Sequence, residues 1–305
     1  MKAVDALLSG LVDYAGLFPP ASEGMREALE NYASYRNGED SLALGRFIVP
    51  ISRLRELEDA GRDLVPRGPG SEPWRLSVLV GDDVRLAGEE MLDFNRRHGT
   101  GSSDGHALID VAELKASAVD EIERQHAELP DFFTAYFEIP LKGNILPLVK
   151  AIARAGARAK VRTGGVTPES IPPAKEVIDF IATCQSEAVP FKATAGLHHP
   201  VRGSYRLTYE ADSPVGTMYG FLNVFVASAL LFTGRSRNSA TAALEETDRR
   251  AFVFDDDAIG WRDVRITTDQ LEASRQFAIS FGSCSFREPI DELRPLTGMA
   301  PSDHK

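Results

Sequence analysis

Residues 159–200 read AKVRTGGVTPESIPPAKEVIDFIATCQSEAVPFKATAGLHHP, two short β-prone segments joined by a helix-like run. Each segment carries a lysine, Lys160 or Lys192, with a glycine four residues later. Side chains alternate along a strand, so Lys160 shares a face with Arg162, and Lys192 with Thr194. This strand–helix–strand pattern predicts a parallel pair with a crossover helix.

If the two strands are neighbours, their cations share a small enclosed space. Such burial is costly unless an anion or useful chemistry is present. Gly164, Gly165 and Gly196 follow the strands, where the chain must turn tightly or approach another group.

The same alternation of strands and helices extends over the whole chain and predicts a single (β/α)8 barrel domain, residues 1–305. Seven strands are expected at 12–17, 46–50, 74–80, 107–111, 133–139, 160–163 and 191–195. Helices are expected at 23–36, 52–60, 82–97, 117–129, 145–155, 173–187 and 289–296. The glycine-rich segment 99–105 is predicted to be a connector, and the tail 297–305 to be disordered.

The eighth strand has two candidates, residues 251–254 and residues 278–281, and a glycine-and-hydroxyl turn after the second favours it. Residues 201–269 then form an insertion after strand seven. The insertion holds the most apolar run, residues 218–232, which at 15 residues is short for a membrane span. We expect a buried helix there, or a helix covered by a second subunit in a homo-oligomer.

Composition limits the classes of partner. The net charge is −11 and the pI about 5.1, so no global positive field attracts nucleic acid. Two cysteines make neither a disulfide framework nor a zinc motif, and favour a reduced, cytoplasmic setting. A small-molecule substrate is the expected partner, without nucleic acid or membrane.

Several motifs in chain order resemble deoxyribose-phosphate aldolase. KVRTGG and KATAGLHH resemble that family's two lysine strands, and LIDV and YFEIPL its fourth and fifth. SFGSCS resembles the final turn that holds phosphate. The chain departs from the pattern at Arg162, Ala195 and Cys284.

The resemblance implies a (β/α)8 lyase with no cofactor. Lys160 matches the Schiff-base lysine, Lys192 the second lysine and Asp110 the proton-relay aspartate. The turns around Gly164, Gly165, Gly196, Ser283 and Ser285 match phosphate-binding turns. Arg162, Glu138, Thr194 and His198 are further candidates for substrate binding.

The residues themselves leave three functions open. A lysine attacks a carbonyl only as the free amine, and burial beside another cation favours that form. A metal-dependent isomerase or lyase would instead use His198, Asp110 and Glu138. A non-catalytic binding barrel is the third reading, with Lys160 fully ion-paired and no open cavity at the strand ends. Cys284 is expected to be a small buried side chain rather than a nucleophile.

Overall fold

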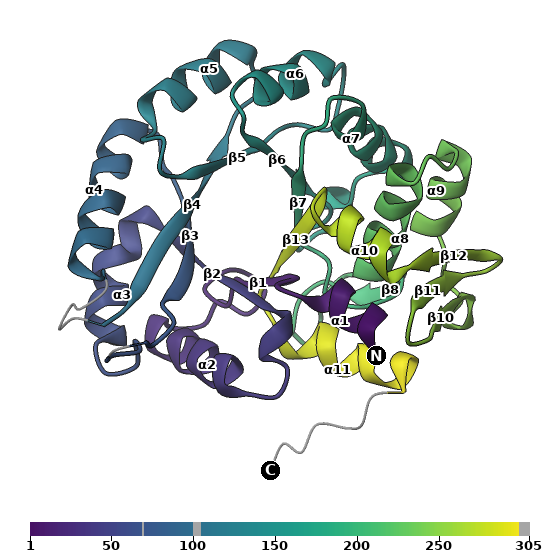
Figure 1. Cartoon of the computed structure of the whole chain (residues 1–305), viewed down its shortest axis with the longest axis horizontal. Coiled ribbons are helices and arrows are strands. Elements are labelled where there is room, and N and C mark those ends of the chain that lie inside the picture. Colours follow the sequence, from purple (N-terminus) through teal and green to yellow (C-terminus); the bar gives the residue numbers. More distant parts are fainter. Residues whose placement is uncertain (69, 100–104, 299–305) are drawn as a thin grey trace.

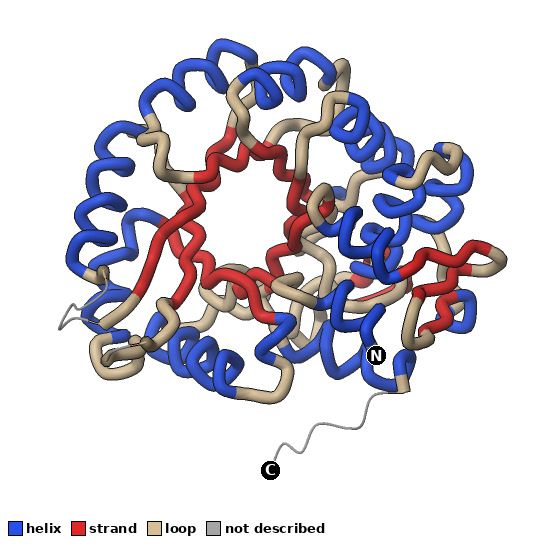
Figure 2. Tube along the Cα trace, viewed as in Figure 1, coloured by secondary structure: helices blue, strands red, loops and turns tan. Residues whose placement is uncertain are grey.

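The structure is a computed structural model that describes residues 1–68, 70–99 and 105–298. Its centre is a closed barrel of eight parallel strands in the order β1-β13-β7-β6-β5-β4-β3-β2, with helices outside (Figures 1 and 2). The strands are β1 (Val12–Tyr14), β2 (Leu44–Pro50), β3 (Trp74–Leu79), β4 (Ala107–Lys115), β5 (Thr134–Glu138), β6 (Arg158–Arg162), β7 (Phe191–Thr194) and β13 (Ala278–Ser283). The predicted (β/α)8 fold is therefore confirmed.

Helices follow the strands because their apolar residues recur at helical spacing. In α4 (Val84–Arg97) the buried residues Ala87, Met91 and Phe94 form one face, and Asp83 caps the first turn. The other helices are α1 (Lys2–Leu8), α2 (Met25–Asn37), α3 (Leu54–Gly61), α5 (Val119–Glu128), α6 (Leu146–Arg154), α7 (Ala174–Ser186), α8 (Phe221–Phe232), α9 (Arg237–Leu244), α10 (Thr268–Arg275) and α11 (Arg287–Thr297), with short 3-10 turns η1 (Ser41–Ala43), η2 (Ile51–Arg53), η3 (Pro168–Ser170) and η4 (Arg249–Ala251). Residues 100–104 and 299–305, which hold most of the predicted connector and tail, lie outside the described residues.

The eighth barrel strand is β13, as the turn after residues 278–281 predicts, and it pairs with both β1 and β7. The rejected candidate, residues 251–254, lies in an antiparallel sheet of β10 (Phe252–Phe254), β11 (Ala258–Trp261) and β12 (Val264–Thr267) outside the barrel (Figure 1). A hairpin of β8 (Gly203–Arg206) and β9 (Val215–Met218) follows β7. Leu207 and Met218 from this hairpin line a cavity at the strand ends.

The apolar helix α8 is covered by its own chain. Residues 221–231 are all buried, and the helix packs against α7, α9, α10 and β13. Only Phe232 at its end is 40% exposed. The prediction of a buried helix in this run is therefore confirmed. None of the helices in the described part of the chain is long and apolar enough to cross a membrane.

Strand β4 positions the site through an irregularity. Ile109 pairs with Leu76 and Val111 with Ser77, so Asp110 is an extra residue in β4. Such a bulge shifts the inward-facing set by one residue. The strand also runs to Lys115, four residues beyond the predicted end, so Glu113 pairs with Leu79 and lies inside the barrel, 3% exposed.

Candidate active site

Two cavities open at the carboxyl ends of the barrel strands, of about 310 and 1290 Å³. Leu79, Glu113, Lys160 and Arg162 line both, so these four residues lie at the boundary between them. The smaller cavity is largely apolar, with Ile48 and Phe18 among its walls. Its volume is at the low end of the range for small-molecule sites.

Lys160 lies in the middle of this boundary. It is 5% exposed, and its Nζ is 2.8 Å from both Glu113 Oε2 and Glu138 Oε2. Glu138 Oε2 is buried and lies within hydrogen-bonding distance of this ammonium group. Lys160 is therefore held between two carboxylates at the boundary of the cavities.

Lys192 is the Cα partner of Lys160 in the β6–β7 ladder, so the predicted proximity of the two lysine strands is confirmed. Its environment differs, because its Nζ donates hydrogen bonds to Asp13 Oδ2 at 2.5 Å and Glu113 Oε1 at 2.7 Å. Ser280 donates to the same Asp13 oxygen, and Ser77 to the same Glu113 oxygen. Lys192 lines neither cavity and is 1% exposed.

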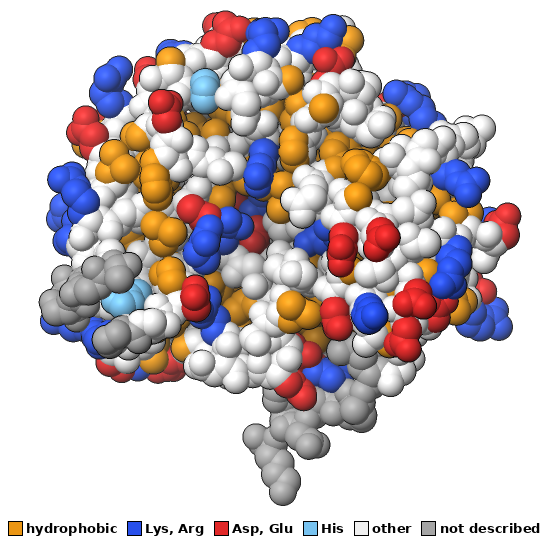
Figure 3. All heavy atoms as spheres, viewed as in Figure 1, with side chains coloured by type: hydrophobic (Ala, Val, Ile, Leu, Met, Phe, Trp, Pro, Cys, Tyr) orange, Lys and Arg blue, Asp and Glu red, His pale blue; other side chains and the backbone are white. Residues whose placement is uncertain are grey.

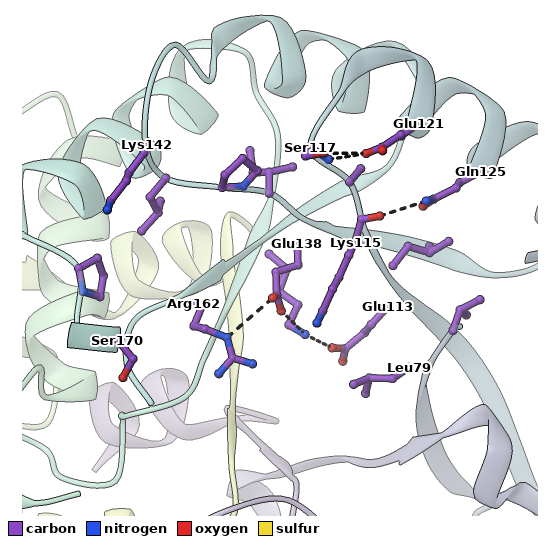
Figure 4. Close-up of a pocket in the computed structure, with 18 of the residues that line it drawn as sticks. Leu79, Glu113, Lys115, Ser117, Glu121, Gln125, Glu138, Lys142, Arg162 and Ser170 are labelled. Atoms are coloured by element: carbon purple, nitrogen blue, oxygen red, sulfur yellow. Dashed lines mark hydrogen bonds and ion pairs between the residues drawn. The ribbon is translucent and has the colours of Figure 1, made fainter. Parts of the chain in front are cut away.

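The charged side chains form a continuous series that we call the charge chain: Asp13, Lys192, Glu113, Lys160, Glu138 and Arg162. Its three carboxylates and three cations alternate in sign, so it is formally neutral. Figure 4 shows the outer part, where dashed lines run from Arg162 to Glu138 and on to Glu113. Neutrality makes this burial tolerable, because each charge has an opposite neighbour.

Burial and pairing act in opposite directions on these groups. Burial alone would raise the pKa of Glu113, but the ammonium groups of Lys160 and Lys192 outweigh it and hold that pKa well below its usual range. Burial would lower the pKa of Lys192, but Asp13 and Glu113 outweigh it and raise the pKa above the ordinary lysine value. The pKa of Glu138 is lowered because Lys160 outweighs its burial. Glu113 and Lys192 therefore remain charged at neutral pH.

The larger cavity adds exposed cations. Lys115 from β4, Lys142 after β5 and Arg162 at the end of β6 all line it (Figure 4). Arg162 is half-exposed, and its Nε is 3.7 Å from Glu138 Oε1. These side chains can accept an anionic group of a ligand without breaking a buried pair.

Asp110, the aspartate matched to the proton relay, is not brought to the lysines. Its two oxygens accept hydrogen bonds from Arg46 Nε at 2.8 Å and Nη2 at 2.6 Å, and Arg75 also donates to it. These arginines lie near the starts of β2 and β3, so the cluster is toward the amino end of the barrel interior. Asp110 lines neither cavity.

The predicted turn residues divide into two groups. Gly165, Thr194 and Gly196 line the smaller cavity. Gly164 packs closely against Gly196, because a Cβ at position 164 would lie 3.0 Å from the Gly196 Cα. Gly196 itself has a φ of +74°, a conformation that favours glycine. Ser283 and Ser285 line neither cavity. The Ser285 hydroxyl accepts from the Glu288 amide and the Ser283 hydroxyl from the Ser285 amide, so both organise the turn into α11.

The residues proposed for a metal are separated by their pairing. His198 Nδ1 is 2.7 Å from Glu288 Oε2, Glu138 pairs with Lys160, and Asp110 pairs with arginines. In residues 1–68, 70–99 and 105–298 no three His, Cys, Asp or Glu side chains are grouped so that they could hold a metal ion. The hypothesis of a non-catalytic binding barrel predicts that Lys160 is ion-paired and that no cavity opens at the strand ends. The ion pairs are present, and the cavities are open.

Sequence reasoning missed Glu113, which pairs with both lysines, and Asp13, which pairs with Lys192. Glu113 lies two residues beyond the end of the predicted fourth strand, and the signal for it was an acidic residue within the run VAEL. Asp13 lies between two apolar residues of the first predicted strand. No protein-family model, curated protein or solved structure compared with this chain matches it.

Proposed function

We propose that the protein is a carbon–carbon lyase of the Schiff-base type, in which Lys160 attacks the carbonyl group of a small aldehyde or keto substrate. The observation that carries the proposal is that Lys160 borders an open cavity while lying 2.8 Å from two carboxylates. Loss of water from the initial adduct gives an iminium, which draws electrons from the adjacent carbon–carbon bond and allows it to break or form. The resemblance of the two lysine strands to deoxyribose-phosphate aldolase supports the same chemistry.

Attack requires the neutral amine, so Lys160 must first release a proton. Glu138 Oε2 is the best-placed acceptor, because it is 2.8 Å from Nζ and its side chain lines the larger cavity. Its neighbour Arg162 keeps a positive charge beside it while the proton moves. Glu138, rather than Asp110, is therefore the proposed acid–base group.

The charge chain also suits the intermediate. An iminium at Lys160 carries the same positive charge as the ammonium group it replaces, so the pairing with Glu113 is retained. Lys192 stays hydrogen-bonded to Glu113 and fixes that carboxylate. Positioned charges of this kind stabilise a cationic intermediate without reorganising during the reaction.

The cavities limit the substrate. The smaller one, of about 310 Å³, suits a compact molecule, and its apolar walls suit a short carbon chain. Arg162 at the boundary and Lys115 in the larger cavity favour an anionic group, either phosphate or carboxylate. The proposed substrate is thus a small anionic carbonyl compound.

Borohydride trapping tests the proposal. The intact protein is incubated with small aldehydes and ketones, with and without phosphate or carboxylate groups, and then reduced and mapped by mass spectrometry. A stable adduct should appear on the Lys160 peptide at substrate concentrations that leave the exposed Lys115 unmodified. Equal labelling of both lysines, or labelling of Lys115 alone, would contradict the assignment.

A further inference from the structure

A thiol, an imidazole and a carboxylate line up at the edge of the smaller cavity. Cys284 directly follows β13, and its Sγ is 3.8 Å from His198 Nε2. The other ring nitrogen of His198, Nδ1, is 2.7 Å from Glu288 Oε2 in the first turn of α11. A carboxylate on one ring nitrogen fixes the ring so that the other faces the sulfur.

Both reactive side chains reach the cavity that Lys160 lines. Cys284 is 5% and His198 8% exposed, yet both form part of its wall. Tyr209 completes the group, because its hydroxyl donates to Glu288 Oε2 at 3.0 Å and lies 3.9 Å from the sulfur. The thiol is therefore largely shielded from bulk water but open to a ligand in the cavity.

We propose that Cys284 is an activated nucleophile, with His198 as its base and Glu288 as the positioning carboxylate, and that it binds an aldehyde group in this cavity. The thiol proton passes to His198 Nε2, and the sulfur then adds to the carbonyl carbon. As the S–C bond forms, the C=O π electrons move to oxygen, which takes the proton back from the imidazolium. The product is a reversible hemithioacetal, and no oxidant or reductant is needed.

The surrounding charges favour the state in which His198 holds the proton. Burial alone would lower the pKa of His198, but the contacts with Cys284 and Glu288 outweigh it and raise the pKa to about 10. The pKa of Tyr209 is raised by burial and by its contact with the Glu288 carboxylate, so it remains a neutral donor. Two further groups flank the cluster: His199, whose Nδ1 is 2.8 Å from Glu292 Oε1, and Arg162. Lys160 and Glu113 line the same cavity.

The second cysteine provides an internal control. Cys184 lies in α7, is fully buried, and its pKa is raised by burial alone. Alkylation by iodoacetamide, mapped to each cysteine by mass spectrometry, tests the activation from pH 5 to 9. We expect Cys284 to react at nearly the same rate at pH 6 and pH 8, and Cys184 to stay unmodified. By contrast, the alkylation rate of an unactivated thiol rises about tenfold for each unit of pH increase, as long as the pH is below the pKa of the thiol.

Variants separate activation from simple accessibility. His198→Gln and Glu288→Gln should each restore the steep pH dependence and slow alkylation at pH 6 about tenfold or more. Lys160→Met should leave the profile flat, so this result does not depend on the proposed lyase. A steep profile in the unmodified protein, or a Cys284 as unreactive as Cys184, would overturn the proposal even if a variant fails to fold.

Propanal tests the ligand class. In the Lys160→Met variant, where no Schiff base forms at that position, millimolar propanal should slow alkylation of Cys284 several-fold, and dilution should reverse the protection. Propan-1-ol is the matched control, because it has the same carbon chain without a carbonyl group. Equal protection by both, or by neither, would rule out hemithioacetal formation.

Discussion

Toward the amino end of the barrel interior, Asp110 accepts hydrogen bonds from Arg46 and Arg75, and toward the carboxyl end Lys160 lies between Glu113 and Glu138. In both regions carboxylate side chains are buried against cationic side chains. Figure 3 shows that charged side chains also gather over the middle of the face that it presents. Only the second region borders the cavities. Cavity access, rather than residue type, distinguishes the pair that we propose to be reactive from the pair at the amino end.

The largest effect is expected at Lys160. Replacement by Met should abolish the borohydride adduct and lower turnover of a trapped substrate by roughly a thousandfold or more, because the nucleophile is lost. Kinetics and peptide mapping measure both effects. Lys115→Met, which removes an exposed lysine from the same cavity, should retain the Lys160 adduct.

For Lys192 we expect a larger loss of folding stability than for Lys160, and a smaller effect on turnover. Lys192→Met leaves Asp13 and Glu113 without their shared cation, and breaking a buried pair costs about 3–5 kcal/mol. Urea unfolding of both lysine variants gives the comparison. If Lys160→Met destabilises the protein as much as Lys192→Met, the two lysines do not divide their roles in this way.

The two carboxylates at opposite ends can be compared directly. Glu138→Gln should lower turnover about 100-fold, because a general acid–base group is removed. Asp110→Asn should change turnover less than threefold, which is small compared with the loss expected when an acid–base group is removed. A larger loss for Asp110→Asn would favour the relay implied by the family resemblance.

The smallest effect is on the pH dependence of stability. Pairing lowers the pKa of Glu113, Glu138 and Asp110, so each contributes stability that is complete above the unfolded value of about 4. This contribution is lost as the pH falls through the lower folded pKa values. Urea unfolding from pH 6 to 3 should therefore show falling stability, with a shallower slope in Glu138→Gln. An unchanged slope in that variant would mean that Glu138 contributes little to this linkage.

The barrel could be predicted from the sequence because strands and helices alternate and because a turn motif follows residues 278–281. The neighbouring lysines followed from the same alternation. Glu113 could not be predicted, because strict alternation from Asp110 turns Ala112 and Leu114 inward. One extra residue in β4 reverses that order, and bulges leave little trace in a single sequence.

The cysteine cluster escaped prediction for a different reason. Cys284 and His198 are 86 residues apart, and they meet only because β7 and β13 are adjacent in the closed barrel. Glu288 joins them through the first turn of α11. Contacts made by the ends of neighbouring strands depend on strand order, and strand order is a property of the complete fold.

The pairing of β1 with β13 has a consequence for synthesis. Val12 lies opposite Phe281, so the first barrel strand finds one of its partners only after Phe281 has left the ribosome. Until then β1 and β7 each present an unpaired edge, a known hazard for association between nascent chains. Truncation before residue 278 should leave both edges open permanently, and we expect such a product to aggregate even though seven of the barrel strands are present.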